Sequence, residues 1–290
     1  MSKLHKYGVR DFEKDFPSEE ACIERVFLAH HTRECSCGGK YALLKGRRQY
    51  QCSRCRYQIA PTANTIFHKS DTPLRLWFVA ILMFSNAKSG YSAKQLEREL
   101  NVTYKTAWRM LKLIRGALKQ SVKKLKGIVE IDETYFGGRF RSGRGNKLQK
   151  QAIKAKSVIA GAIERGGSMK ASVAPNSKSK TLGSFIDQIL SPKETILMTD
   201  SSNRYEKITR GFERHFVDHS KGEYARGGVH VNSVESFWSH IKRSITGTHK
   251  AISKKYLQSY LYGFVFHYNN RGNDNFRFSL LLGALLRPVR

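Results

Sequence analysis

Two β-prone runs that each end in an aspartate constrain the second half of this chain most. One run is Gly127-Ile-Val-Glu-Ile-Asp132 and the other is Thr195-Ile-Leu-Met-Thr-Asp200, and turn-like or polar residues follow both. Further β-prone runs alternate with amphipathic helical segments from residue 127 to residue 270. This alternation predicts an α/β domain, a sheet covered by helices.

A third acidic residue, Glu235, lies in a stretch after His230 that predicts an amphipathic helix. Its apolar residues recur at i, i+4, i+7 and i+11 and so share one face: Val234, Trp238, Ile241 and Ile245. Glu235 and Lys242 stand seven residues apart, nearly superimposed at the edge of that face. Glu235 and Lys242 could form an ordinary surface ion pair. At this edge, however, Lys242 is better placed to meet a phosphate.

The carboxylates of Asp132, Asp200 and Glu235 are predicted to converge at one side of the sheet. Such a cluster repels itself unless cations occupy it, and Mg²⁺ (or Mn²⁺) suits its oxygen ligands. Two such ions can activate a water or hydroxyl and stabilise the leaving oxygen in phosphodiester cleavage. Three nearby acids are rivals for these places: Glu130 and Glu133 for Asp132, and Asp218 for Asp200. Glu130 is the closest rival, because it shares the strand face of Asp132.

Four closely spaced cysteines predict a structural zinc site. Cys35-Ser-Cys37 and Cys52-Ser-Arg-Cys55 flank a segment with the alternation of a hairpin. Two cysteine pairs on a hairpin offer four thiolates for tetrahedral Zn²⁺ and leave no open position for catalysis. The first pair is shorter than Cys-x-x-Cys. Either its loop is tightened, or His30 or His31 replaces one thiolate.

The segment from Ser92 to Leu111 predicts a helix-turn-helix. Ser92 would cap the first helix, Asn101-Val102 would make the turn, and Thr103 would cap the second helix. The second helix would present three residues to a DNA groove: Tyr104, Lys105 and Arg109. An ordinary helical hairpin inside a core is an equally good interpretation of this stretch alone.

The charge of the chain points to a polyanionic partner. It has 290 residues, with 52 Lys and Arg against 23 Asp and Glu, for a net charge of +29. Such a surplus indicates nucleic acid. One basic loop, between residues 139 and 156, is a candidate phosphate clamp, and its first basic residues are Arg139, Arg141, Arg144 and Lys147. The longest apolar run, Leu76 to Phe84, is too short for a membrane span. We expect a soluble intracellular protein with no membrane partner.

The order of these motifs resembles a known family. The motifs are, in order, the zinc ribbon, the helix-turn-helix, Val-Glu-Ile-Asp132-Glu-Thr-Tyr-Phe-Gly-Gly, Thr-Asp200 and His-Val-Asn-Ser-Val-Glu235-Ser-Phe-Trp-Ser-His-Ile-Lys242-Arg. Together they resemble bacterial DDE insertion-sequence transposases of the branch with an N-terminal zinc ribbon. The resemblance covers about residues 15 to 272. It implies a ribonuclease-H-like mixed sheet with flanking helices, catalytic Asp132, Asp200 and Glu235 with Lys242, and terminal inverted repeats as substrate. Asn232, three residues before Glu235, is a candidate neutral ligand.

We therefore expect four parts: an N-terminal helix and zinc ribbon in 1–68, a helix-turn-helix region in 69–126, the catalytic domain in 127–272 and a tail in 273–290. The expected activity is metal-dependent cleavage at the element's ends followed by strand transfer into target DNA. We also expect a homodimer or larger assembly on DNA, in the bacterial cytoplasm and at the nucleoid. The alternative is a non-catalytic DNA-binding regulator that keeps the fold.

Overall fold

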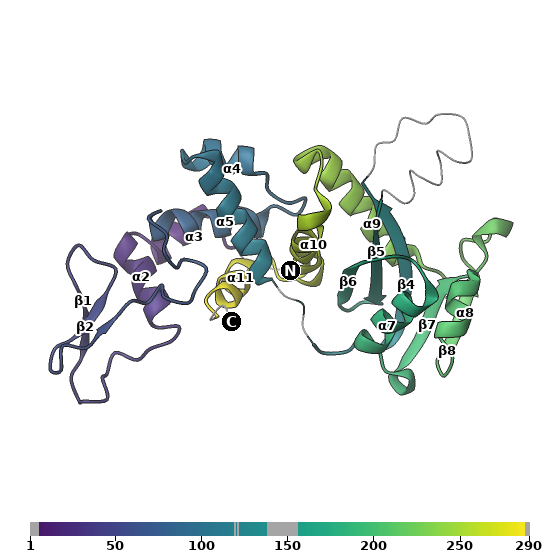
Figure 1. Ribbon diagram of the computed structural model, residues 1–290, viewed down its shortest axis with the longest axis horizontal. Helices are drawn as coiled ribbons and strands as arrows, with labels where there is room; N and C mark the ends of the chain where they lie inside the picture. Colours follow the sequence, from purple (N-terminus) through teal and green to yellow (C-terminus); the bar gives the residue numbers. More distant parts are fainter. Residues whose placement is uncertain (1–5, 119, 121, 138–155, 288–290) are drawn as a thin grey trace. The chain divides into compact units, whose positions relative to one another are not determined.

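The computed structural model describes residues 6–118, 120, 122–137 and 156–287, and it divides the chain into two compact units (Figure 1). The first unit is Met1–Leu118 together with Gly272–Arg290, and the second is Lys119–Arg271. The basic loop expected to clamp phosphates lies outside the described residues. In the part of the chain that the structure describes, no helix combines the length and the apolar character needed to cross a bilayer.

The first unit is built on short helices around an aromatic core. Its first two helices are α1 (Val9–Asp15) and α2 (Glu19–Phe27), and the apolar α3 (Leu74–Asn86) follows after the cysteine segment. Ser18 caps α2 by accepting the backbone N–H of Ala21. The Glu19 carboxylate accepts the backbone N–H groups of Leu74 and Arg75 at 2.7 and 2.9 Å. This acid on α2 therefore caps α3, which lacks a side-chain cap of its own.

The cysteine segment forms a small antiparallel sheet. Its strands are β1 (Tyr41–Leu43), β2 (Tyr50–Cys52) and β3 (Gln58–Ile59), paired in the order β1-β2-β3. The hairpin predicted between the two cysteine pairs is therefore present. Tyr50 stacks on Phe27 of α2, with ring centroids 3.9 Å apart, and fixes the sheet to the helices of the same unit.

Two helices joined by a tight turn follow in the places that the sequence predicts. They are α4 (Ala93–Leu100), capped by Ser92, and α5 (Tyr104–Ala117), capped by Thr103. Asn101 makes the turn with φ of 49°, a left-handed conformation that asparagine tolerates better than most residues. One side of α5 faces the core, since Ala107, Leu111 and Ile114 are buried.

The last helix, α11 (Arg277–Leu285), also belongs to the first unit and packs on α3. In Figure 1 it is the yellow helix beside the elements of that unit. Phe278 contacts the rings of Phe12 and Phe16 edge-on, and Arg277 donates to the backbone oxygen of Ser85. The segment was expected only as a tail, because the partners that stabilise it lie more than 190 residues earlier.

The second unit holds a five-stranded mixed sheet. Its strands are β4 (Gly127–Phe136), β5 (Ser157–Glu164), β6 (Met169–Ala174), β7 (Thr195–Asp200) and β8 (Glu213–Val217). They lie in the order β6-β5-β4-β7-β8, antiparallel across β6, β5 and β4, and parallel across β4, β7 and β8. This is the ribonuclease-H-like arrangement that the resemblance implies.

Helices cover both faces of this sheet. On one face lie α7 (Ser179–Ile189) and α8 (Asn203–Ile208), which bury residues such as Ile186 and Tyr205 against the sheet. On the other lie α9 (Asn232–Ser244) and α10 (Lys254–Asn269), with a π-helical turn, Ile245–His249, between them. The sheet therefore has two buried faces, and each face has its own apolar core.

One local prediction is wrong. The strand with Asp132 does not end there, because β4 continues to Phe136 and pairs with the start of β5. This difference has a consequence for the site, since it places Asp132 inside a strand rather than on a turn.

Candidate active site

Asp132 and Asp200 lie level with each other on adjacent parallel strands. The pairing of β4 with β7 runs from Gly127 opposite Thr195 to Glu130 opposite Met198. The pairing ends there, and Asp132 and Asp200 each lie two residues beyond it, near enough for the charge of Asp200 to act on Asp132. Both carboxylates share the sheet face covered by α9, because Phe136 and Met198, an even number of residues away, pack in the core of that face.

Glu235 lies in the first turn of α9, and its charge reaches Asp132. Burial, together with the negative charges of Glu133, Asp200 and Glu235, raises the pKa of the Asp132 carboxyl to about 7. Asp200 and Glu235 are therefore near enough for their charges to act on Asp132, and their joint role as metal ligands stays a prediction. Such mutual repulsion is what a bound cation would relieve, and the donor set, carboxylate oxygens only, fits Mg²⁺ or Mn²⁺.

The Asp132 side chain is held by a neighbour that the sequence analysis did not assign. Trp238 of α9 donates its indole Nε1–H to Asp132 Oδ2 over 3.1 Å. The indole fits there because Gly161 stands opposite Asp132 on β5. A Cβ at residue 161 would lie 2.5 Å from the Trp238 ring. The periodicity of α9 identified Trp238 as a core residue, but its polar contact requires the register of β4 and β5.

Asp200 and Glu235 have different surroundings. Asp200 Oδ1 accepts the backbone N–H of Ser202 at 3.0 Å, and this closes the turn after β7. Glu235 is partly exposed, with 43% of its side chain accessible, and its Oε1 lies 3.7 Å from Nδ1 of His219. One carboxylate is thus fixed by its own backbone, whereas the other retains rotamer freedom to adjust to a ligand.

Glu130, the closest rival to Asp132, has a different task. Its side chain is fully buried and accepts the backbone N–H groups of Ser233 and Val234 at 2.7 and 3.2 Å. Arg165 pairs with it, Nε to Oε1, at 2.7 Å, and also donates to the backbone oxygen of His230. Because no side chain of α9 caps its own first turn, Glu130 serves as the cap from β4.

The other two rivals are also committed elsewhere. Glu133 points to the opposite face of β4, where it pairs with Arg204 and accepts the hydroxyl of Tyr205. Asp218 follows β8 and accepts hydrogen bonds from Ser220 and Ser201, which lower its pKa, with the Ser220 side chain the largest cause. Both side chains therefore have partners of their own, although the charge of Glu133 also acts on Asp132.

Lys242 and Asn232 are both exposed on α9. Lys242 stands two turns after Glu235, as expected, and borders a hollow at the end of β4. Four of the basic residues expected to contact DNA lie outside the described residues: Arg139, Arg141, Arg144 and Lys147.

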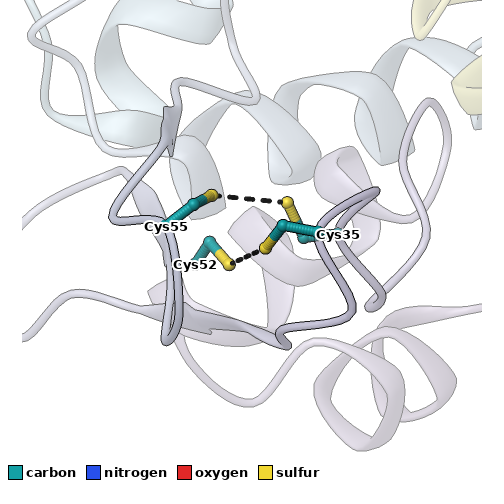
Figure 2. A group of neighbouring side chains, drawn as sticks. Cys35, Cys52 and Cys55 are labelled. Atoms are coloured by element: carbon teal, nitrogen blue, oxygen red, sulfur yellow. Dashed lines mark hydrogen bonds between the residues drawn. The ribbon is translucent and has the colours of Figure 1, made fainter.

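In the first unit, the four predicted zinc ligands converge. The Sγ atoms of Cys35, Cys37, Cys52 and Cys55 all lie within 4.8 Å of one another. Cys35 Sγ lies 3.7 Å from Cys55 Sγ, and Cys37 Sγ lies 3.5 Å from Cys52 Sγ. Figure 2 labels Cys35, Cys52 and Cys55 of this cluster. Tetrahedral zinc with bonds of about 2.3 Å needs sulfur atoms about 3.8 Å apart. The donor set and its size therefore fit a closed zinc site.

The short first pair closes without help from histidine. Gly38 has φ of 79°, which tightens the loop, and a Cβ on Gly39 would lie 2.6 Å from Cys52 Sγ. His30 Nε2 contacts the backbone oxygen of Leu286 instead, and His31 packs on Phe27. The tightened loop is thus the alternative that the structure supports.

Backbone N–H groups favour the thiolate at Cys35 and Cys52. The backbone N–H of Cys37 and then the hydroxyl of Tyr41 lower the pKa of Cys35 to about 6, and the backbone N–H of Cys55 lowers the pKa of Cys52. At Cys55 the backbone N–H of Tyr57 lowers the pKa, but hydrogen bonds with the side chains of Cys37 and Cys52 help to raise it to about 12. Outside the cluster, burial raises the pKa of Cys22 to about 12, which is typical of an inert structural thiol.

The residues predicted to face a DNA groove lie on α5. Tyr104 and Lys105 are exposed at its start, and Lys94 lies over the Tyr104 ring at 5.1 Å. Arg109 is half-buried: its Nη2 donates to the backbone oxygen of His68 at 3.4 Å, and its guanidinium lies 6.0 Å from the Trp77 ring. A role of all three in DNA binding stays a prediction.

Comparison with known proteins gives a family match over most of the second unit. Residues 124–269 match the family model described as ISXO2-like transposase domain. The chain is 27% identical over 237 residues to an uncharacterized protein in transposable element ISH50 of Halobacterium salinarum, a match that covers 78% of this chain and 80% of that protein.

Solved structures give weaker similarities. One similar chain comes from the simian T-cell lymphotropic virus intasome in complex with PP2A regulatory subunit B56 gamma, with a TM-score of 0.30 and 11% identity. The match covers 61% of this chain and 64% of the intasome chain, which is less than two thirds of the intasome chain's length. A chain of the Mos1 strand transfer complex is similar with a TM-score of 0.29 and 11% identity, over 72% of this chain and 75% of that one.

Proposed function

The chain belongs to the ISXO2-like transposase domain family, and we propose from this that it is a DNA transposase of the DDE type. It cleaves DNA at the terminal inverted repeats of an insertion sequence and joins the freed 3′ ends to target DNA. Asp132, Asp200 and Glu235 are the metal ligands of this reaction. The observation that supports the proposal is the raised pKa of the buried Asp132 carboxyl, to which the charges of Asp200 and Glu235 contribute.

The residues around the cluster have distinct tasks. Asp132 and Asp200 lie on adjacent strands of the sheet, which fix the positions of these two metal ligands. Glu235, on α9, is the third ligand. Divalent ions held there would supply Lewis-acid stabilisation of the charge that develops in phosphodiester cleavage. Trp238 fixes the orientation of Asp132 through its indole N–H. Lys242, exposed two turns beyond Glu235, neutralises a backbone phosphate.

The remaining parts select and hold DNA. A net charge of +29 supports binding through phosphates, and α5 presents Tyr104, Lys105 and Arg109 for recognition of the ends. Zn²⁺ on Cys35, Cys37, Cys52 and Cys55 has a structural role, because four protein ligands leave no site for substrate. Two DNA ends must meet for transposition, so we propose that two or more chains assemble on DNA.

Cleavage and joining of labelled duplexes taken from the DNA beside the coding sequence test this function. The reaction is run with Mg²⁺, with Mn²⁺ and with neither ion, for the wild type and for Asp200→Asn. We expect metal-dependent cutting and joining that Asp200→Asn abolishes. Asp187→Asn is the matched control, because Asp187 is exposed on α7 and should retain full activity. Tight binding by all variants, with no cutting under any condition, would support the non-catalytic regulator instead.

A further inference from the structure

A hollow in the second unit, distinct from the carboxylate cluster, has the size and lining of a binding site. It has a volume of about 800 Å³, within the range of roughly 300–1,000 Å³ that is usual for small-molecule sites. It lies among the end of β4, the start of β5, the end of α9, the π-helical turn and the start of α10. All its lining residues belong to the second unit.

The lining combines an apolar floor with a basic rim. Phe136 and Leu257 are buried in the core beneath it, and Ile252 packs against the same core while staying partly exposed. Lys242, Lys250 and Lys254 contribute to the rim. None of the lining residues, all within the described part of the chain, is acidic. A ligand for this hollow therefore needs a flat apolar part and more than one negative charge.

The wall that carries Lys250 departs from regular backbone. Residues 245–249 form a π-helical turn, a feature found mostly as a local bulge at functional positions. Lys250 follows with φ of 62° and ψ of −53°, a conformation that residues with a side chain rarely adopt. Backbone of this kind persists where the surrounding structure or a function requires it. Here it directs the chain around the hollow.

The hollow also lies along the path from the carboxylates. Tyr135, on its wall, is three residues beyond Asp132 on β4, or about 10 Å at strand rise. Lys242, on its rim, is seven residues beyond Glu235 on α9, also about 10 Å at helix rise. At about 3.4 Å per nucleotide along a stacked strand, this distance is about three nucleotides.

We propose that this hollow takes one unstacked nucleotide of the DNA strand, within about three nucleotides of the phosphate that is cut. The base lies on Phe136, Ile252 and Leu257, and the flanking phosphates meet Lys242, Lys250 and Lys254. The proposal rests on the proposed function. A base removed from the stack fixes the register of the strand, so the hollow would determine which phosphate reaches Asp132, Asp200 and Glu235.

A pocket-filling variant tests the occupant. Ile252→Trp occupies the hollow from its partly exposed wall, and Ile128→Trp is the matched control, at an exposed isoleucine on β4 away from it. Each protein is assayed on duplexes from the flanks of the coding sequence and on a set with one abasic nucleotide at each position near the cut. We expect Ile252→Trp to lose about tenfold in binding of the intact duplex, the loss of one base contact. The difference in affinity between Ile252→Trp and the wild type should be smaller on the one duplex whose abasic site removes the base that enters the hollow.

A second measurement detects binding without cleavage. Thr246→Cys, on the wall of the hollow, is reacted with a maleimide in Mg²⁺-free buffer, with and without duplex, and labelling of residue 246 is followed by mass spectrometry. We expect about tenfold slower labelling with intact duplex, and less protection by the duplex that is abasic at the sensitive position.

The outcomes separate this proposal from the function on which it rests. The nucleotide pocket would be overturned, and the transposase function left intact, by either of two results. One is equal binding and cutting of DNA by Ile252→Trp and the wild type. The other is protection of the thiol introduced at residue 246 that is the same for every abasic duplex. Equal labelling of that thiol with and without DNA would mean that DNA does not enter the hollow, which also overturns the proposal. If no DNA is cut by the wild type but the base-dependent protection is present, the pocket stands and the proposed chemistry fails.

Discussion

The Glu130 carboxylate accepts the backbone N–H of Ser233 over 2.7 Å, which ties the central strand β4 to the first turn of α9. Asp132 lies two residues beyond one partner of this contact, and Glu235 lies two residues beyond the other. The contact therefore relates two of the candidate metal ligands through buried, fully paired groups. A cap supplied from another element fixes both the start and the position of the helix.

Replacing Glu130 by Gln should therefore cost both stability and metal binding. The charge that pairs with Arg165 is lost, and we expect a loss of about 3 kcal/mol in the free energy of unfolding, measured with urea. The midpoint for Mg²⁺ in DNA cleavage should rise, because α9 is less firmly held. Glu206→Gln, at an exposed acid, should leave both unchanged. A destabilised variant with the wild-type Mg²⁺ midpoint would reduce Glu130 to a purely structural role.

Gly161→Ala should displace Trp238. The new Cβ would lie 2.5 Å from the indole, so the ring has to move and its hydrogen bond to Asp132 is broken. We expect a loss of about 2 kcal/mol in stability and a shift in tryptophan fluorescence. Gly116→Ala, at a helical glycine with open space around it, should be neutral or slightly stabilising. Unchanged fluorescence in Gly161→Ala would argue against close packing of the indole on β5.

The stability of the protein without Mg²⁺ or Mn²⁺ should depend on Asp132 and on pH. The pKa of this carboxyl is about 7 in the folded protein against an ordinary value of 3.8, so its charge destabilises the fold. That cost is full above about pH 7, declines as the pH falls, and is absent below about pH 4. Asp132→Asn should stabilise the metal-free protein by about 2 kcal/mol more at pH 8 than at pH 5. Asp187→Asn, measured by the same urea titrations, should show no such difference.

Lys250 allows charge and backbone conformation to be tested separately. Lys250→Gly and Lys250→Ala both remove the ammonium, but only glycine adopts a φ of 62° without strain. Both variants should lower the slope of log affinity for DNA against log salt by about 0.9. Thermal unfolding should show Lys250→Gly at least as stable as Lys250→Ala. An unchanged salt slope in both would remove Lys250 from the DNA contacts.

Zinc removal should unfold the β1–β2 region selectively. We expect about one zinc ion per chain, lost in Cys35→Ser and retained in Cys22→Ala, since Cys22 is buried away from the four-thiol cluster. Chelation of the ion should expose residues 35–55 to proteolysis while the second unit stays protected. A full complement of zinc in Cys35→Ser would show that another ligand completes the site.

Much of the second unit follows from local signals in the sequence. Alternation and helical periodicity placed its strands and helices, because each element has a face buried by its neighbours. In the first unit, the caps Ser92 and Thr103 were equally readable, since their hydrogen bonds reach only three residues ahead. The three candidate metal ligands could be predicted from the sequence because each acid occupies a recognisable place on such a strand or helix.

What could not be predicted depends on distant partners. The extension of β4 beyond Asp132 needs Ser157 opposite Phe136, and the cap on α9 needs Glu130, which is 103 residues before Ser233. Glu130 and Asp132 are alike in local sequence, and only their partners separate a structural carboxylate from a candidate ligand. Similarly, the position of α11 could not be predicted from the residues near Arg277, because its partners belong to the first helices of the chain.

The return of α11 to the first unit has a consequence for synthesis on the ribosome. Helices α1 and α3 leave the ribosome early, but the residues that cover them, Phe278 among them, emerge only after the whole second unit. The second unit is a continuous stretch and can fold as it emerges, whereas the first must wait with part of its aromatic core uncovered. Premature termination after residue 271 would thus spare the carboxylate-bearing unit and leave the zinc-binding one unfinished.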